Sequence, residues 1–121
     1  MGANFLVVAS GGEDFGIYGE DVQRAAAAQS DFLGIMANRH RLHILFLLLE
    51  SEHSVRDLMR ELNETPVGVS RHLTILRDNN IVRSHRCGKN VRYSLTCPHT
   101  VQMVKTIAEI CCQRDKEVEG K

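Results

Sequence analysis

Apolar positions recur with the 3.6-residue period of an α-helix in several segments of this 121-residue chain. The first such segment begins at Glu20, and its predicted face consists of Val22, Ala25, Ala26, Gln29, Phe32, Leu33 and Met36. Asn38 is a suitable N-cap for a second helix, from Arg39 to Glu50. That helix is apolar on most sides after Leu42, so we expect it to be central and buried. Residues 1–19 are rich in glycine and show no sustained period, which predicts a flexible leader.

Two shorter helical patterns follow. Ser54 is expected to cap a helix that ends near Leu62, with its apolar side chains inward. Thr65 is expected to cap the next helix, and Pro66 stands at its first position, where the missing N–H costs no hydrogen bond. The predicted buried stripe of this helix is Val69, Leu73 and Leu76, and Asp78-Asn79-Asn80 ends it.

The pattern then changes to the two-residue alternation of half-buried strands. Residues 81–86 and 91–95 alternate in this way, and we expect Val91, Tyr93 and Leu95 to face the core. Thr96 or Cys97 could cap a last helix that runs to about Arg114. Its predicted apolar face is Val101, Val104, Ile107, Ala108, Ile110 and Cys111, and residues 115–121 are interpreted as a frayed tail.

A helix-turn-helix over residues 54–80 followed directly by a hairpin over 81–95 is a winged helix. The predicted fold is therefore mainly α with a small β-hairpin (α+β), in the order α-α-α-α-β-β-α. Residues 20–114 would form one domain. The dominant use of this module is binding to duplex DNA.

The distribution of charge supports a DNA partner, although the formal net charge of the chain is zero. Residues 65–95 carry six basic side chains and one acidic one, a net of +5. Residues 1–38 carry five acidic side chains and one basic one, a net of −4. A compact basic region on a neutral chain provides the charge that phosphate binding requires.

The residues expected to touch DNA come from the second helix of the motif and from the wing. On the helix they are Pro66, Val67, Ser70, Arg71, Thr74 and Arg77, and on the wing they are Arg86, Lys89 and Arg92. Arg71 could read guanine through its paired donors, whereas Pro66 and Val67 offer only apolar contact, for instance to a thymine methyl group. The wing cations are expected to gather for phosphate or minor-groove contact. The ordinary alternative for Arg71 and Arg77 is a solvated helix face.

Other function classes fit the sequence less well. His40 and His43 are interpreted as surface or helix-end residues, and His72 as a structural histidine beside the buried stripe. No cluster of nucleophile, base and orienting acid is evident, so we expect no enzyme and no cofactor. The four cysteines follow no disulfide framework spacing, and no apolar stretch is long enough to span a membrane. These observations predict a cytoplasmic protein without a membrane partner.

The stretch from Ile35 to Glu50, IMANRHRLHILFLLLE, and the stretch from Ser54 to Leu95 resemble the ArsR/SmtB family of winged-helix repressors. The phrases MAN-x-x-RL-x-IL, S-x-HL-x-x-LR and RYSL carry this resemblance, which covers about residues 25–113. The sequence is most similar to the branch with NolR, HlyU and BigR. The apolar face of the last helix predicts that this helix pairs with the first helix and with a second subunit. The resemblance implies an operator-binding homodimer that blocks transcription or displaces another protein from DNA.

The resemblance also implies where a ligand would act. The zinc positions of the family fall on Cys97, His99, Ile110 and Gln113, so half of the ligands are missing. The thiol-switch positions fall on Phe46 and Cys112, so the partner thiol is missing. Cys111 and Cys112 remain candidates for a thiol or metalloid sensor, and Cys97 and His99 for an improvised metal site. The alternative for Cys111 and Cys112 is that they act only as small hydrophobic residues in a dimer interface. The inducer is unknown. A protein-interaction module that has lost DNA binding is a further alternative, because Pro66 and Val67 replace polar readers.

Overall fold

The computed structural model describes residues 19–119, with side chains described as far as Cys112. The helices are α1 (Glu20–Met36), α2 (Arg39–Glu50), α3 (Val55–Leu62), α4 (Pro66–Asp78) and α5 (Pro98–Glu119), and the strands are β1 (His53–Ser54), β2 (Val82–Cys87) and β3 (Asn90–Leu95). The predicted leader lies outside the described residues, apart from Gly19. The chain divides into two compact units, Met1–Gly34 and Ile35–Lys121, and the helix-turn-helix and the wing both belong to the second.

Helix boundaries follow the capping residues that the sequence predicts. The Asn38 side chain accepts hydrogen bonds from the backbone N–H groups of His40 (3.0 Å) and Arg41 (3.1 Å) at the start of α2. Ser54 forms a capping box with Asp57, and Thr65 caps α4 through a 3.0 Å bond from the Gly68 N–H. Each cap satisfies backbone donors that have no partner within the helix. The predicted starts of α2, α3 and α4 are therefore confirmed.

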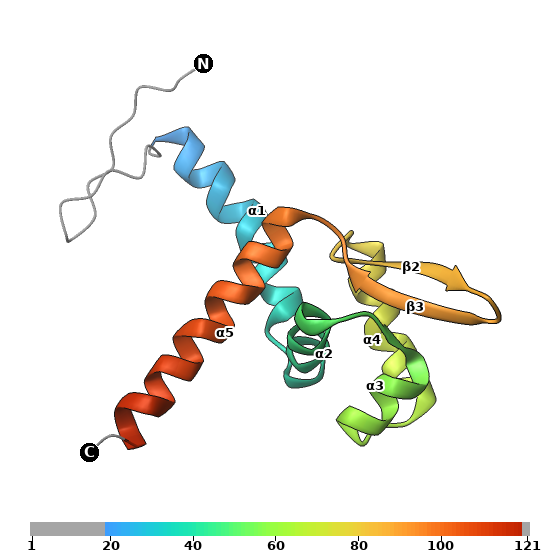
Figure 1. Cartoon of the computed structure of the whole chain (residues 1–121). Coiled ribbons are helices and arrows are strands. Elements are labelled where there is room, and N and C mark those ends of the chain that lie inside the picture. The colour runs from blue at the N-terminus through green and yellow to red at the C-terminus, as the bar shows by residue number, and fades with distance from the viewer. Residues whose placement is uncertain (1–18, 120–121) are drawn as a thin grey trace. The chain divides into compact units, whose positions relative to one another are not determined.

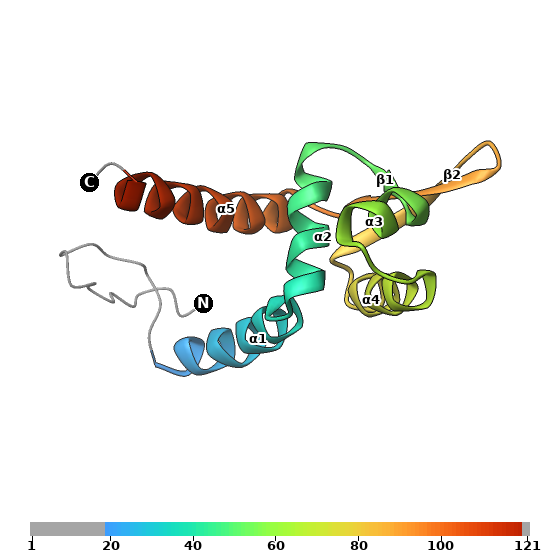
Figure 2. The same cartoon turned by 90° about the horizontal axis from the view of Figure 1, so that it is seen from below.

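The core of the second unit lies between α2, α3, α4, the sheet and the first turns of α5 (Figures 1 and 2). Helix α2 contributes Ile44, Leu45 and Leu48, and this confirms that the helix is central. The predicted stripe of α4 is also buried, since Val69, Leu73 and Leu76 are at most 2% exposed. Other buried members of this core are Leu58, Leu62, Ile81, Val82, Leu95 and Val104.

The sheet has a third strand that the sequence did not predict. The two residues of β1 pair with β3, His53 with Tyr93 and Ser54 with Arg92, so the strand order is β1-β3-β2. A two-residue strand is too short to show alternation, and only its partner reveals it. Val91, predicted to face the core, is 37% exposed because it lies towards the free end of the hairpin. The mainly helical winged-helix fold itself is confirmed.

The last helix starts after Cys97, one of the two caps that the sequence offered, and it differs from the prediction at its C-terminal end. Thr96 does not act as its cap: its hydroxyl donates to the carbonyls of Asn80 (2.6 Å) and Ile81 (3.0 Å) at the base of the hairpin. Cys97 takes the cap position, with its sulfur 3.4 Å from the hydroxyl of Thr100. The helix continues to Glu119 instead of ending near Arg114, because residues 115–119 contain neither glycine nor proline.

Within residues 19–119, no helix by itself has the length and apolar composition to cross a membrane, although α1 and α2 taken together would pass on those two criteria alone.

Candidate DNA-binding surface

The outward face of α4 carries the predicted contact residues together. Pro66, Val67, Ser70, Arg71 and Thr74 are all exposed and line one shallow groove of about 390 Å³. The opposite face of α4 is the buried stripe, so packing against the core determines which side chains point outward. This outward face of α4, called the recognition face below, brings together the helix residues that the sequence analysis predicts to contact DNA. Arg77 is also exposed, in the last turn of the helix.

A glutamate covers the start of the recognition helix. The Glu64 carboxylate accepts a hydrogen bond from the Thr65 N–H at 3.0 Å, and its other oxygen lies 3.4 Å from Nε2 of His40. The stem of Glu64 packs on Gly68, where an added Cβ would lie 3.0 Å from the Glu64 side chain. Gly68 therefore provides the space that lets Glu64 connect the turn to α2. The sequence-based interpretation did not include this contact.

Two histidines lie between α2 and α4. The rings of His40 and His72 are 5.5 Å apart, and Nδ1 of His72 is 3.3 Å from the guanidinium of Arg41. Burial, and then the nearby charges of Arg41 and His40, lower the pKa of His72 below its usual range. His72 is thus held neutral in a packed contact, as a structural histidine would be. His40 is half-buried at the start of α2, and the prediction did not foresee its contact with α4.

The three cations predicted to gather on the wing lie at different places on it. In the register of the hairpin, Arg86 stands opposite Val91, and Arg92 stands opposite His85. Directly paired residues share a face and neighbouring residues alternate, so Arg86 and Arg92 point to opposite sides of the sheet. Lys89 is exposed in the turn that joins the two strands.

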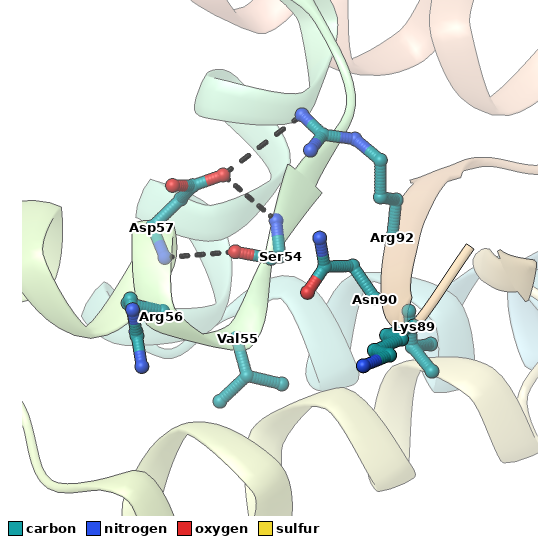
Figure 3. A pocket seen from close by; sticks show the side chains of 8 residues that line it. Ser54, Val55, Arg56, Asp57, Lys89, Asn90 and Arg92 are labelled. Atoms are coloured by element: carbon teal, nitrogen blue, oxygen red, sulfur yellow. Dashed lines mark hydrogen bonds and ion pairs between the residues drawn. The ribbon is translucent and has the colours of Figure 1, made fainter. Parts of the chain in front are cut away.

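Arg92 is held by carboxylates of the protein itself. Its guanidinium donates to the Glu52 carbonyl at 3.0 Å, lies 3.8 Å from the Glu52 carboxylate, and lies 3.9 Å from the Asp57 carboxylate. Glu52 also pairs with His85 at 3.2 Å. Figure 3 shows Arg92 reaching towards Asp57, while Lys89 points away from it. Arg92 therefore braces β3 against the start of α3.

Asp57 joins this brace to the capping box. Its carboxylate accepts a hydrogen bond from the Ser54 N–H at 3.0 Å, and Ser54 accepts one from the Asp57 N–H at 3.1 Å. The bond from the Ser54 N–H is the main cause that lowers the pKa of Asp57. The ionised carboxylate thus stabilises the start of α3 while it faces Arg92.

A groove of about 450 Å³ separates α3 from the wing, and Arg56 and Lys89 lie along it (Figure 3). The sequence-based prediction missed Arg56, an exposed side chain in the first turn of α3. Its position between two inward residues of an amphipathic helix could have identified it. With Lys89 it adds positive charge beside the recognition face.

The candidate sensor residues belong to α5 or directly precede it, and not to α3, α4 or the wing. Cys111 and Cys112 are exposed free thiols on α5, and Cys97 is half-buried at its start. The hydrogen bond to the Thr100 hydroxyl lowers the pKa of Cys97. His99 is exposed. Among the side chains of residues 19–112, no three of histidine, cysteine, aspartate or glutamate are grouped so that they could hold a metal ion.

Comparisons with known proteins agree with this geometry. Residues 38–84 match the family described as "Bacterial regulatory protein, arsR family". The chain is 30% identical to the nodulation protein NolR of Rhizobium meliloti over 102 residues, which cover 84% of this chain and 80% of that protein. The chain belongs to the ArsR family. It is 34% identical to the arsenical resistance operon repressor of Escherichia coli over 85 residues, 68% of this chain and 72% of that protein.

Solved structures of ArsR-family regulators share the fold. Reduced HlyU from Vibrio cholerae superposes with a TM-score of 0.73 at 29% identity, covering 77% of this chain and 98% of that one. The repressor BigR from Xylella fastidiosa also gives a TM-score of 0.73 at 29% identity, covering 80% and 96%. As a member of this family, the protein is a winged-helix DNA-binding transcriptional regulator and not an enzyme.

Proposed function

We propose that this protein is a homodimeric repressor that binds a pseudo-palindromic operator in the cytoplasm. The observation that carries the proposal is the groove on α4, where Ser70 and Arg71 stand exposed beside the basic groove between α3 and the wing. Ser70 and Arg71 offer donors to base edges, and Arg56 and Lys89 offer charge to phosphates. Arg77 in the last turn of α4 and Arg86 on β2 are also exposed. Arg92 contributes less to DNA contact, because two carboxylates already face its guanidinium.

A second copy of the chain accounts for the apolar surface of α5. Val101 and Ile110 are 38% and 52% exposed there. A two-fold dimer built on such a surface sets two recognition helices about one turn of DNA apart, which is the spacing that a pseudo-palindrome needs. The pairing of α1 with α5 in that dimer is part of the proposal.

Selection of duplexes from a random pool, followed by a fluorescence titration of the selected duplex, tests the proposal. We expect two half-sites with about 10 base pairs between their centres, a stoichiometry of two chains per duplex, and weaker specific binding by Arg71→Ala. A reporter gene behind the selected site should be repressed in cells. Absence of any selected duplex at low salt would contradict the proposal and favour the alternative of a protein-interaction module.

A thiol response is a second candidate, and the exposure of both Cys111 and Cys112 favours it. Arsenite, polysulfide or peroxide would then release the protein from DNA, and Cys112→Ser would abolish that release. Equal DNA binding with and without these reagents would contradict the thiol response and favour the alternative that both cysteines are small apolar residues of a dimer contact.

A further inference from the structure

The most exposed large hydrophobic residue that the structure describes lies on the recognition helix. Val67 is 69% exposed, compared with 52% for Ile110, the next in order. It is the second residue of α4 and lines the groove with Ser70 and Arg71. Valine is a weaker helix former than the polar residues Gln, Glu or Lys, so local helix stability does not account for its presence. In the proposed complex, a side chain at this position faces the DNA.

The start of α4 holds Val67 in one orientation. Pro66 fixes the backbone before it, and Thr65 caps the same turn through the Gly68 N–H. A valine in a helix also has one strongly preferred rotamer. Its two methyl groups are therefore presented to the groove with little conformational entropy left to lose on binding.

Thymine is the natural base with an apolar group in the major groove, its 5-methyl group. We propose that Val67 reads this methyl group, which gives the operator a thymine at one position of each half-site. This inference rests on the proposed DNA-binding function and adds the base class that the recognition face selects. Serine or arginine at position 67 would prefer the polar edge of a base, whereas valine gains only where a methyl group meets it.

The position of Arg71 places the thymine relative to a guanine. Val67 and Arg71 are four residues apart and share one face of α4. This spacing is about 6 Å along the helix axis, and base pairs rise about 3.4 Å, so the two contacts fall within about two base pairs of each other. We therefore expect each half-site to hold a guanine read by Arg71 and a thymine within two base pairs of it.

Replacement of thymine by deoxyuridine removes the methyl group and leaves base pairing unchanged, so it tests the proposal directly. The duplex is the one that the protein itself selects from a random pool, with each thymine of the half-sites replaced in turn. Loss of one buried methyl group is expected to weaken binding about fourfold, and on the order of 15-fold when both half-sites are changed. Thymines outside the half-sites serve as the control and should show no effect. Val67→Ala, which keeps the helix and removes the two Cγ methyl groups, should lose less affinity than the wild type when thymine is replaced by deoxyuridine.

A second measurement uses only the wild-type protein. Cytosine at the thymine position should weaken binding, and 5-methylcytosine should recover about fourfold, because it restores the methyl group at the same place in the groove. Equal binding of thymine and deoxyuridine duplexes at every position would overturn the proposal. So would a loss of the same size in Val67→Ala, since another residue would then read the methyl group. Failure to select any duplex would instead contradict the DNA-binding function itself.

Discussion

The wing shows how position in the fold separates two cations that stand three residues apart in the chain. Lys89 is exposed in the hairpin turn and has no carboxylate at ion-pair distance among the side chains of residues 19–112. Arg92 donates to the Glu52 carbonyl at 3.0 Å and faces the Glu52 and Asp57 carboxylates. We therefore expect Lys89→Ala to remove a phosphate contact and Arg92→Ala to remove mainly an internal brace.

The size of the effect follows from counterion release. Each neutralised phosphate adds about 0.9 to the slope of log K against log salt concentration, and a dimer carries Lys89 twice. Lys89→Ala should lower that slope by about 1.8. The ratio of the wild-type binding constant to that of the variant should therefore be about 60-fold larger at 0.1 M salt than at 1 M salt. Arg92→Ala should lower the slope by less than about 1, and its loss of affinity should persist at high salt.

Fluorescence anisotropy with a labelled operator duplex, between about 50 and 200 mM salt, measures both slopes. Lys105→Ala, an exposed lysine of α5, is the matched control and should keep the slope of the wild type. The reasoning is refuted if Lys89→Ala keeps the wild-type slope, or if Arg92→Ala loses as much slope as Lys89→Ala.

Three further predictions concern α4, α3 and the histidine contact. Arg71→Ala should weaken specific binding by about 1–3 kcal/mol and relax the base preference at one position of the DNA half-site. Selection of duplexes with the variant measures this preference, and an unchanged preference would exclude Arg71 as a base reader. Ser54→Ala should lower the free energy of unfolding by about 1 kcal/mol and Tm by about 4 °C in calorimetry. The control Ser30→Ala, at an exposed position of α1, should not lower Tm. Equal Tm values for the two variants would show that the capping box contributes little. Because the pKa of His72 is lowered in the folded state, its contribution to stability is complete above about pH 6.5 and is lost as the pH falls from there through the lower pKa of the folded state. Urea unfolding should thus show a smaller loss of stability below pH 6.5 in His72→Gln than in the wild type, and an identical loss would contradict this role.

Local signals in the sequence were sufficient to predict most of the helices and the recognition face. Asn38, Ser54 and Thr65 satisfy backbone donors two or three residues away, so the starts of α2, α3 and α4 depend on short stretches of chain. The 3.6-residue period likewise places Val69 and Leu73 inward and therefore Ser70 and Arg71 outward, whatever packs against the buried side.

Only the tertiary structure decided which charges of this region are free for DNA. The partners of Arg92 are Glu52 and Asp57, 40 and 35 residues earlier in the chain, and no spacing rule in the sequence connects them. The register of β2 and β3 separates Arg86 from Arg92, although both are cations of one short hairpin. Caps and periods act within one or two turns, whereas ion pairs and strand register depend on distant segments that meet when the core forms.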